Sequence, residues 1–122
     1  MNILIIEDNA IQAMSLEMMV KKMGFQSVKK ILNGNQAMEL IDNFKPDILL
    51  VDIYLDSDIT GVDIVKQAQK NSDISVIYIS GNSNLKCKEM VSETTYIDFL
   101  SKPVNYKRLE LLLTEITSSV AE

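Results

Sequence analysis

The strongest constraint on the fold is an alternation of short apolar runs with longer segments of helical periodicity. The apolar runs are rich in isoleucine, leucine and valine, which is typical of buried strands. We predict strands over residues 2–6, 27–32, 48–51, 74–79 and 96–100. The segments that follow them predict helices over residues 10–23, 37–44, 61–68, 84–92 and 109–116. Strands that alternate with helices imply right-handed crossovers and a parallel sheet covered on both faces.

Glycine and proline residues lie at the boundaries of these segments and support this assignment of strands and helices. Gly24 follows the first predicted helix as a C-cap, and Gly61 opens the third. Pro46 separates the second helix from the third strand. Within the first helix, a spacing of three and four residues predicts one buried face, made of Ala13, Leu16, Val20 and Met23.

The composition limits the class of protein. A length of 122 residues fits one domain spanning 1–122, and 47% hydrophobic residues is ordinary for a globular chain. No apolar run approaches the roughly 20 residues of a membrane span, and no signal-peptide pattern is present. A net charge of −5 argues against direct binding of nucleic acid. The single cysteine, Cys87, excludes an internal disulfide and suits a reducing cytoplasm.

The chain contains no histidine. This excludes a Ser-His-Asp triad, an imidazole metal site and a phosphohistidine carrier. Any acid–base, metal or phosphoryl chemistry must therefore use carboxylates, hydroxyls and lysines.

Polar side chains of these types stand at the carboxyl ends of four predicted strands: Glu7 and Asp8, Asp52, Ser80 and Lys102. In an open parallel sheet, ligands bind at that edge. Neighbouring carboxylates repel each other unless a cation lies among them, and an all-oxygen ligand set favours Mg²⁺. A carboxylate also acts as a nucleophile and forms an aspartyl phosphate, whose oxygens Lys102 and Ser80 are suited to contact.

The motifs at these strand ends read Ile-Ile-Glu7-Asp8-Asn, Leu-Val-Asp52-Ile-Tyr-Leu, Ile-Ser80-Gly81 and Ser-Lys102-Pro103. Each alone is weakly specific, but together, in this order, the chain resembles the receiver domain of response regulators over essentially its whole length. The resemblance implies a flavodoxin-like (βα)5 three-layer sandwich with strand order 2-1-3-4-5. It also implies that Asp52 is the phosphoacceptor, and that Mg²⁺ is held by Asp8, by Glu7 through water, by Asp52 and by the backbone carbonyl of Tyr54.

The resemblance also assigns a switch. Lys102 would pair with the acceptor and then with the phosphoryl group, Ser80 would move toward the phosphate, and the Phe99 ring would follow Ser80. The Lys102–Pro103 bond is expected to be cis. Ser80 replaces the more frequent threonine and Phe99 the more frequent tyrosine, so this aromatic residue has no phenolic hydroxyl for a hydrogen bond.

The partners implied by the resemblance are a sensor histidine kinase or histidine phosphotransfer protein, and a downstream target or output domain. The latter would meet the face formed by the fourth helix, fifth strand and fifth helix. A homodimer on phosphorylation is a further expectation, as is a cytoplasmic location without membrane binding. On the outer face of the first helix, Ile11, Met14 and Met18 form an apolar stripe, for which we predict docking of the phosphodonor's helices.

Three other functions compete with this interpretation. A Mg²⁺-dependent phosphohydrolase usually has a second acid two residues after its nucleophile, where this chain has Tyr54. A flavodoxin-like cofactor binder needs a phosphate loop after the first strand, where Glu7 and Asp8 would repel phosphate. A pseudo-receiver that binds partners without phosphorylation is the main alternative. The preferred interpretation is a phosphoacceptor switch that catalyses its own phosphorylation and dephosphorylation and is not otherwise an enzyme.

Overall fold

The computed structural model describes residues 1–55, 59–81 and 85–121, and the side chains as far as Ser118. Asn84, the first residue of the predicted fourth helix, lies outside these ranges. The described strands form one parallel sheet in the order β2-β1-β3-β4-β5, which confirms the predicted topology. Their bounds are β1 Asn2–Ile6, β2 Ser27–Ile31, β3 Ile48–Asp52, β4 Ser75–Ser80 and β5 Asp98–Ser101.

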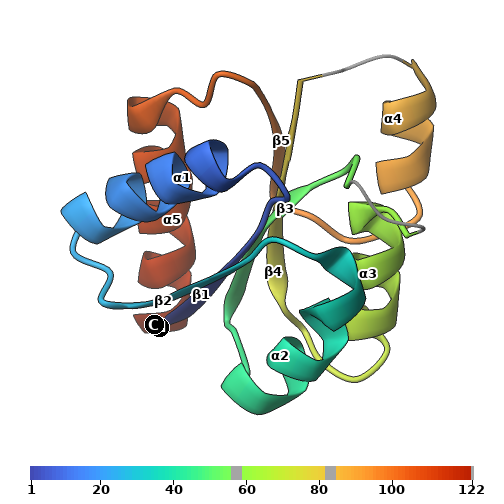
Figure 1. The fold of residues 1–122 in the computed structure, drawn as a ribbon. Coiled ribbons are helices and arrows are strands. Elements are labelled where there is room, and N and C mark those ends of the chain that lie inside the picture. The colour runs from blue at the N-terminus through green and yellow to red at the C-terminus, as the bar shows by residue number, and fades with distance from the viewer. Residues whose placement is uncertain (56–58, 82–84, 122) are drawn as a thin grey trace.

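Helices cover both faces of the sheet, which gives the predicted three layers. Figure 1 shows α1 and α5 on one face and α2, α3 and α4 on the other. Their bounds are α1 Ala10–Lys22, α2 Ala37–Phe44, α3 Gly61–Gln69, α4 Leu85–Val91 and α5 Tyr106–Ala121, with a short 3₁₀ turn over Gly34–Gln36 before α2. Among the described residues, no helix is both long enough and apolar enough to cross a membrane.

Each face of the sheet has its own buried cluster. Residues Ile3 and Ile5 of β1 pack under α1 and α5, whereas Leu4 and Ile6 pack under the other helices. This division follows from the alternation of side chains along a strand. All five residues of β3 are buried, because this strand lies in the middle of the sheet with helices over both faces. The core therefore fixes where β3, and Asp52 at its end, must lie.

Local signals set the ends of α1. Asn9 caps its N-terminus by accepting a hydrogen bond from the Gln12 backbone N–H at 3.0 Å. The helix ends at Lys22, and Gly24 follows with a φ of 105°, a left-handed conformation that glycine adopts without strain. The prediction that Met23 belongs to the buried face of the helix was wrong in part. Met23 lies just beyond the helix and is only partly buried.

The fifth strand was predicted two residues too early. Tyr96 and Ile97 read as apolar strand residues, yet both side chains are exposed and β5 begins at Asp98. The preceding turn is held by Gln69 of α3, whose side-chain amide donates to the Thr95 carbonyl at 2.6 Å and accepts from the Thr95 N–H at 3.2 Å. The apolar pattern does not reveal this contact, since Gln69 lies 26 residues away in sequence.

Candidate functional site

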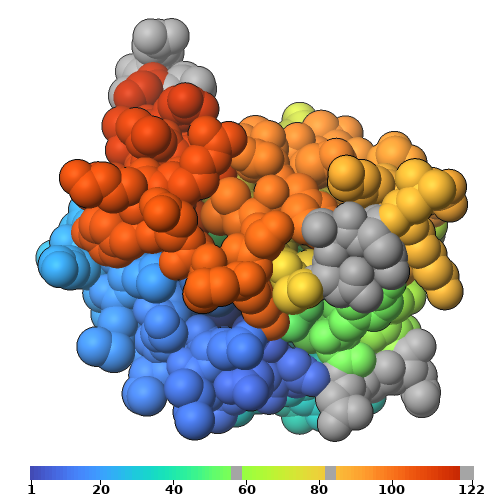
Figure 2. All heavy atoms as spheres, turned by 90° about the horizontal axis from the view of Figure 1, so that it is seen from above, coloured from blue at the N-terminus to red at the C-terminus, as the bar shows by residue number. Residues whose placement is uncertain are grey.

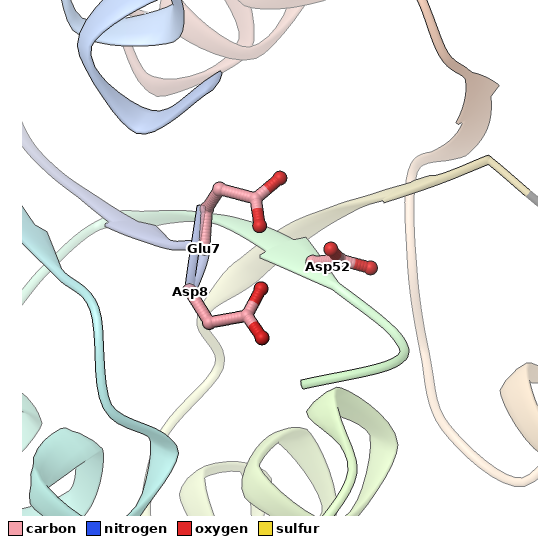
Figure 3. Close-up of side chains that lie close together, drawn as sticks. All are labelled: Glu7, Asp8 and Asp52. Carbon is pink, nitrogen blue, oxygen red and sulfur yellow. The ribbon is translucent and has the colours of Figure 1, made fainter. Parts of the chain in front are cut away.

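Three carboxylates meet at the carboxyl ends of β1 and β3. Glu7, Asp8 and Asp52 each place a carboxylate oxygen within 4.8 Å of the others. Figure 3 shows Glu7 and Asp8 leaving the end of β1 and Asp52 leaving the end of β3, beside one another at one edge of the sheet. Glu7 and Asp52 are buried, whereas Asp8 is half-buried and reachable from solvent. The parallel pairing of β1 with β3 brings these residues together across 45 positions of sequence.

Lys102 joins two of the carboxylates. Its Nζ lies 2.6 Å from Glu7 Oε1 and 2.8 Å from Asp52 Oδ2. The ammonium group offsets one of the three carboxylate charges, so the cluster keeps a formal excess of negative charge. Lys102 reaches this position from the segment after β5, where the Lys102–Pro103 peptide bond is cis, as the resemblance predicted.

Burial and these contacts change the acidity of the paired groups. Burial raises the pKa of Glu7 above its ordinary value, and the nearby Asp52 charge adds to the rise. Hydrogen bonds from Lys102 and from the Asn9 backbone oppose this rise without cancelling it. Burial alone would lower the pKa of Lys102, but its bonds to Asp52 and Glu7 outweigh that effect and raise the pKa. The lysine is therefore held in its charged form inside the site.

Backbone contacts fix the orientation of the carboxylates. The Asn9 N–H donates to Glu7 Oε2 at 3.1 Å, and the Tyr54 N–H donates to Asp52 Oδ1 at 3.1 Å. Asp52 therefore uses one oxygen for Tyr54 and the other for Lys102. Charged hydrogen bonds of this kind are stronger than neutral ones, so the Asp52 carboxylate is held in one orientation.

A glycine allows α3 to approach the site closely. A Cβ added to Gly61 would lie 2.1 Å from the Asp52 carbonyl oxygen and 2.6 Å from Val51 Cγ1. The Gly61 N–H donates to the Ile53 carbonyl at 2.8 Å. Thr60 and Asp63 form a capping box at the same helix start. The sequence marked Gly61 as a helix boundary, but it did not show that α3 begins directly against the backbone of Asp52.

Ser80 and Phe99 lie on the other face of the sheet from Lys102. Ser80 is buried at the end of β4 and follows Val76 and Tyr78, which pack under α2, α3 and α4. Phe99 pairs with Tyr78 across the β4–β5 ladder and packs against the same cluster. Glu7 and Asp52 continue the opposite alternation, after Ile5 and Leu50. The site thus spans the edge of the sheet, with Glu7, Asp52 and Lys102 on one face and the Ser80 hydroxyl and Phe99 ring on the other.

The predicted stripe on the outer face of α1 is exposed. Ile11, Met14 and Met18 are 75%, 50% and 65% exposed. On the inner side of the same helix, a hollow of about 400 Å³ opens between α1 and the segment after β5. Its lining includes Glu7 and Lys102 from the charged cluster, together with Leu16, Met19 and Val104. Figure 2 looks down on this end of the molecule, where blue α1 meets the orange segment that leads into α5.

Comparison with known proteins identifies the family. The model of the response regulator receiver domain matches residues 3–114. The chain belongs to the response regulator receiver domain family. Receiver domains of this kind act in two-component signalling systems, which the sequence had indicated.

The relatives of this receiver domain are of different lengths. It is 27% identical over 118 residues to the chemotaxis protein CheY of Thermotoga maritima, covering 94% of this chain and 96% of that protein. It is 31% identical over 115 residues to a cyclic di-GMP phosphodiesterase of the same organism, covering 93% of this chain but only 30% of that protein. The chain spans about half or less of the length of several curated relatives that it matches, because it covers 30% to 51% of them.

A solved structure supports the same fold. The N-terminal domain of a response regulator/sensory box/GGDEF three-domain protein from Carboxydothermus hydrogenoformans superposes with a TM-score of 0.88. Its sequence is 24% identical, and the match covers 99% of this chain and 97% of that domain. The likeness confirms the flavodoxin-like arrangement.

The carboxylate cluster of this receiver domain fits a hard divalent cation. Its ligand atoms are all oxygens, one member is half-buried and accessible, and Lys102 leaves part of the negative charge uncompensated. Mg²⁺ prefers such oxygen ligands and keeps some of its waters. The donor set is therefore suited to a metal ion beside Asp52.

Proposed function

We propose that this receiver domain accepts a phosphoryl group on Asp52. The observation that carries the proposal is the position of this carboxylate, which is buried between Lys102 and the acidic pair Glu7–Asp8. A carboxylate held in place by Lys102 and by the Tyr54 N–H presents an oriented nucleophile. Together, these groups support phosphoryl transfer more specifically than any one of them does alone.

In the proposed reaction an oxygen of Asp52 attacks the phosphorus of a phosphohistidine or small acyl phosphate. A new oxygen–phosphorus bond forms, and the donor's bond to phosphorus breaks, with its electron pair leaving on the donor. The Lys102 ammonium then exchanges its contact with the carboxylate for one with the phosphoryl oxygens, where it offsets negative charge. Its raised pKa keeps it protonated for this role at neutral pH.

Asp8, Glu7, Asp52 and the Tyr54 carbonyl are the groups that we propose hold Mg²⁺. The ion would supply positive charge that reduces repulsion between the carboxylates and the incoming phosphoryl group. Asp8 is the accessible member of the cluster, which suits it to direct ligation, whereas buried Glu7 already accepts bonds from Lys102 and Asn9. This difference agrees with a water-mediated role for Glu7.

We also propose that Ser80 and Phe99 report phosphorylation to a partner. Both lie on the face that carries α4, on the neighbouring strands β4 and β5. A Ser80 hydroxyl that turns toward the phosphoryl oxygens vacates space that the Phe99 ring can enter. The result is a shift between two conformations, read at the surface of α4, β5 and α5 by a downstream target, an output domain or a second copy of the chain.

The proposed phosphodonor is a sensor histidine kinase or a histidine phosphotransfer protein, which docks its helices on Ile11, Met14 and Met18. The stripe begins two residues after Asn9, whose backbone N–H binds Glu7 in the acidic cluster. A helix bound there would stand close to the acidic cluster, because Asp8 and Asn9 directly precede α1. Output activities, including those in the names of longer relatives, would belong to other domains. The receiver itself would catalyse only its own phosphorylation and dephosphorylation. We propose that it does so in the cytoplasm.

The deciding experiment is intact-mass spectrometry after incubation with acetyl phosphate, with and without Mg²⁺. We expect wild type to gain one phosphoryl group in the presence of Mg²⁺ and Asp52→Ala to gain none. Asp42→Ala, which changes an exposed aspartate of α2, is the matched control and should behave as wild type. Absence of a mass gain in folded, Mg²⁺-binding wild type would refute the proposal and favour the pseudo-receiver.

The docking proposal is tested by comparing two phosphodonors. Met14→Gln with Met18→Gln should slow transfer from a phosphorylated histidine phosphotransfer protein but leave uptake from acetyl phosphate unchanged. Leu111→Gln is the control, because it changes an equally exposed side chain on α5. Equal losses with both donors would show that the stripe supports the fold or the site and does not dock the donor.

A further inference from the structure

Helix α4 is tied to the sheet side of the molecule by hydrogen bonds at both of its ends. Near its start, the Cys87 thiol donates to the Tyr54 hydroxyl with an Sγ–Oη distance of 3.3 Å. Just beyond its end, the Thr94 hydroxyl donates to the Val91 carbonyl at 2.9 Å and lies 2.8 Å from the Tyr78 hydroxyl. Each contact reaches a tyrosine on the β3 or β4 segment, so two tyrosines help to set the position of this helix.

The contact at the end of α4 is the firmer one. Thr94 gives its single hydroxyl proton to Val91, so the Tyr78 hydroxyl must be the donor in the Tyr78–Thr94 bond. The Tyr78 side chain is fully buried, and its ring packs edge-on against Tyr96 with centroids 5.5 Å apart. Breaking this bond would leave buried polar groups without partners, which is unfavourable.

The contact at the start of α4 is weaker. A thiol is a poor donor, and the Tyr54 side chain is 40% exposed, so water can replace Cys87 as its partner. Cys87 itself is fully buried in the cluster under α2, α3 and α4. Unequal bonds at the two ends allow the start of α4 to move while its end stays in place.

Tyr54 also touches the acceptor. Its backbone N–H donates to Asp52 Oδ1, so one residue is bonded both to the carboxylate and, through its phenol, to α4. Conversion of the carboxylate into an acyl phosphate moves the negative charge outward onto the phosphoryl oxygens. The Tyr54 N–H then loses a charged acceptor, which weakens its bond and lets the phenol shift, while the Tyr54 carbonyl keeps its proposed contact with Mg²⁺.

The geometry points to Tyr54 as a releasable latch: phosphorylation of Asp52 breaks the Tyr54–Cys87 bond, and α4 pivots about Val91, Thr94 and Tyr78. The latch is separate from the Ser80–Phe99 pair, because it acts through the residue two positions after the acceptor. Its trigger rests on the proposed function, whereas the bond between Tyr54 and Cys87 does not. The two parts can therefore be tested separately.

Cys87 supplies the readout, because it is the single cysteine of the chain. The rate of its reaction with dithiobisnitrobenzoate under native conditions measures how often α4 exposes the thiol. Tyr54→Phe removes the phenolic oxygen and should raise this rate about two- to fivefold in the unphosphorylated protein. Tyr96→Phe is the matched control, since this tyrosine is 37% exposed and belongs to the same face, and it should leave the rate unchanged.

The trigger is tested by adding acetyl phosphate and Mg²⁺ and following the mass in parallel. Wild-type Cys87 should react faster once the phosphoryl group is present, Asp52→Ala should show no such increase, and Tyr54→Phe should show a reduced one. If the mass rises while the thiol rate stays constant, the latch inference is wrong and the proposed function stands. If the mass does not rise, the proposed function and the trigger fall together, and the Tyr54→Phe comparison still decides the latch.

Hydrogen exchange separates a local movement from general loosening. In Tyr54→Phe, amides of α4 should exchange faster while those of α1 keep the wild-type rate. Faster exchange in both helices would mean that the variant is globally destabilised, which would overturn the latch. Cys87→Ser gives an independent check: serine retains a hydroxyl donor, so α4 exchange should stay closer to wild type than in Cys87→Ala.

Discussion

The two faces of the sheet differ in what their cores are made of. Under α1 and α5, every member of the described buried cluster is isoleucine, leucine or valine. Under α2, α3 and α4, the cluster also contains Tyr78 and Cys87, whose polar atoms bond to Thr94 and Tyr54. An aliphatic core packs without directional bonds, whereas bonded polar groups have a small number of discrete arrangements.

The site divides its groups between these faces. Glu7, Asp52 and Lys102 belong to the α1–α5 face, and Ser80 and Phe99 belong to the face with α4. We propose that the aliphatic face holds the groups that meet the phosphodonor in fixed positions. The face with polar hydrogen bonds is the one that changes conformation. The predictions below test that division, beginning with the largest expected effect.

A cavity in the aliphatic face should lower stability and spare the chemistry. Leu113 of α5 is fully buried, so Leu113→Ala should reduce the free energy of unfolding by about 2–5 kcal/mol. Urea unfolding measures this loss, and intact mass after acetyl phosphate treatment measures uptake at a temperature where the variant is folded. Loss of uptake in the folded variant would contradict the view of this face as a platform only.

A side chain at Gly61 should damage both stability and chemistry. The added Cβ of Gly61→Ala would collide with the Asp52 carbonyl and Val51, so α3 must shift, which costs about 1–3 kcal/mol. Because the clash involves the backbone of Asp52, the proposed acceptor, phosphoryl uptake should slow by about tenfold or more. Gly81→Ala is the control, as its Cβ would enter open space. Similar uptake by both variants would show that the α3 approach does not position Asp52.

The buried phenol of Tyr78 should make the free energy of unfolding decrease at alkaline pH. Burial raises the pKa of Tyr78 to about 12 from the ordinary value of 10.0. Its neutral form therefore stabilises the fold below pH 10.0, and this contribution of about 2–3 kcal/mol is lost as the pH rises toward 12. Tyr78→Phe should lose about 1 kcal/mol at neutral pH and lack the alkaline decline.

Urea unfolding at pH 7, 10 and 11.5 measures this difference. At neutral pH the free energy of unfolding should be larger for wild type than for Tyr78→Phe. This difference should shrink as the pH rises and then change sign. Tyr96→Phe should follow the wild-type curve, because that tyrosine is exposed at the surface. A parallel decline in wild type and Tyr78→Phe would show that Tyr78 is not the titrating group.

The smallest effect is expected on the outer face of α1. Met14→Gln should change the free energy of unfolding by no more than about 0.5 kcal/mol, because the side chain is half exposed. Urea titration of the single variant is sufficient to test this. A loss above about 1 kcal/mol would mean that the stripe contributes to the fold, and the case for a docking surface would weaken accordingly.

The sequence alone determined the order of elements and the residues at the strand ends. Runs such as Ile48–Val51 are apolar throughout because β3 is covered on both faces, and this pattern can be read locally. The placement of Asp52 directly after that run predicts its position at the edge of the sheet. The outward direction of Met14 and Met18 also follows from helical periodicity, and their exposure confirmed it.

Tertiary structure decided which of these groups touch. Lys102 bonds Glu7 across 95 residues of sequence, and Cys87 bonds Tyr54 across 33. The start of β5 depends on Gln69 in another element, and the need for glycine at position 61 depends on the backbone of β3. Periodicity records the face on which a residue lies, but a contact depends on how distant elements pack together. The constellation of side chains was therefore predictable, whereas its hydrogen bonds and close approaches were decided by packing.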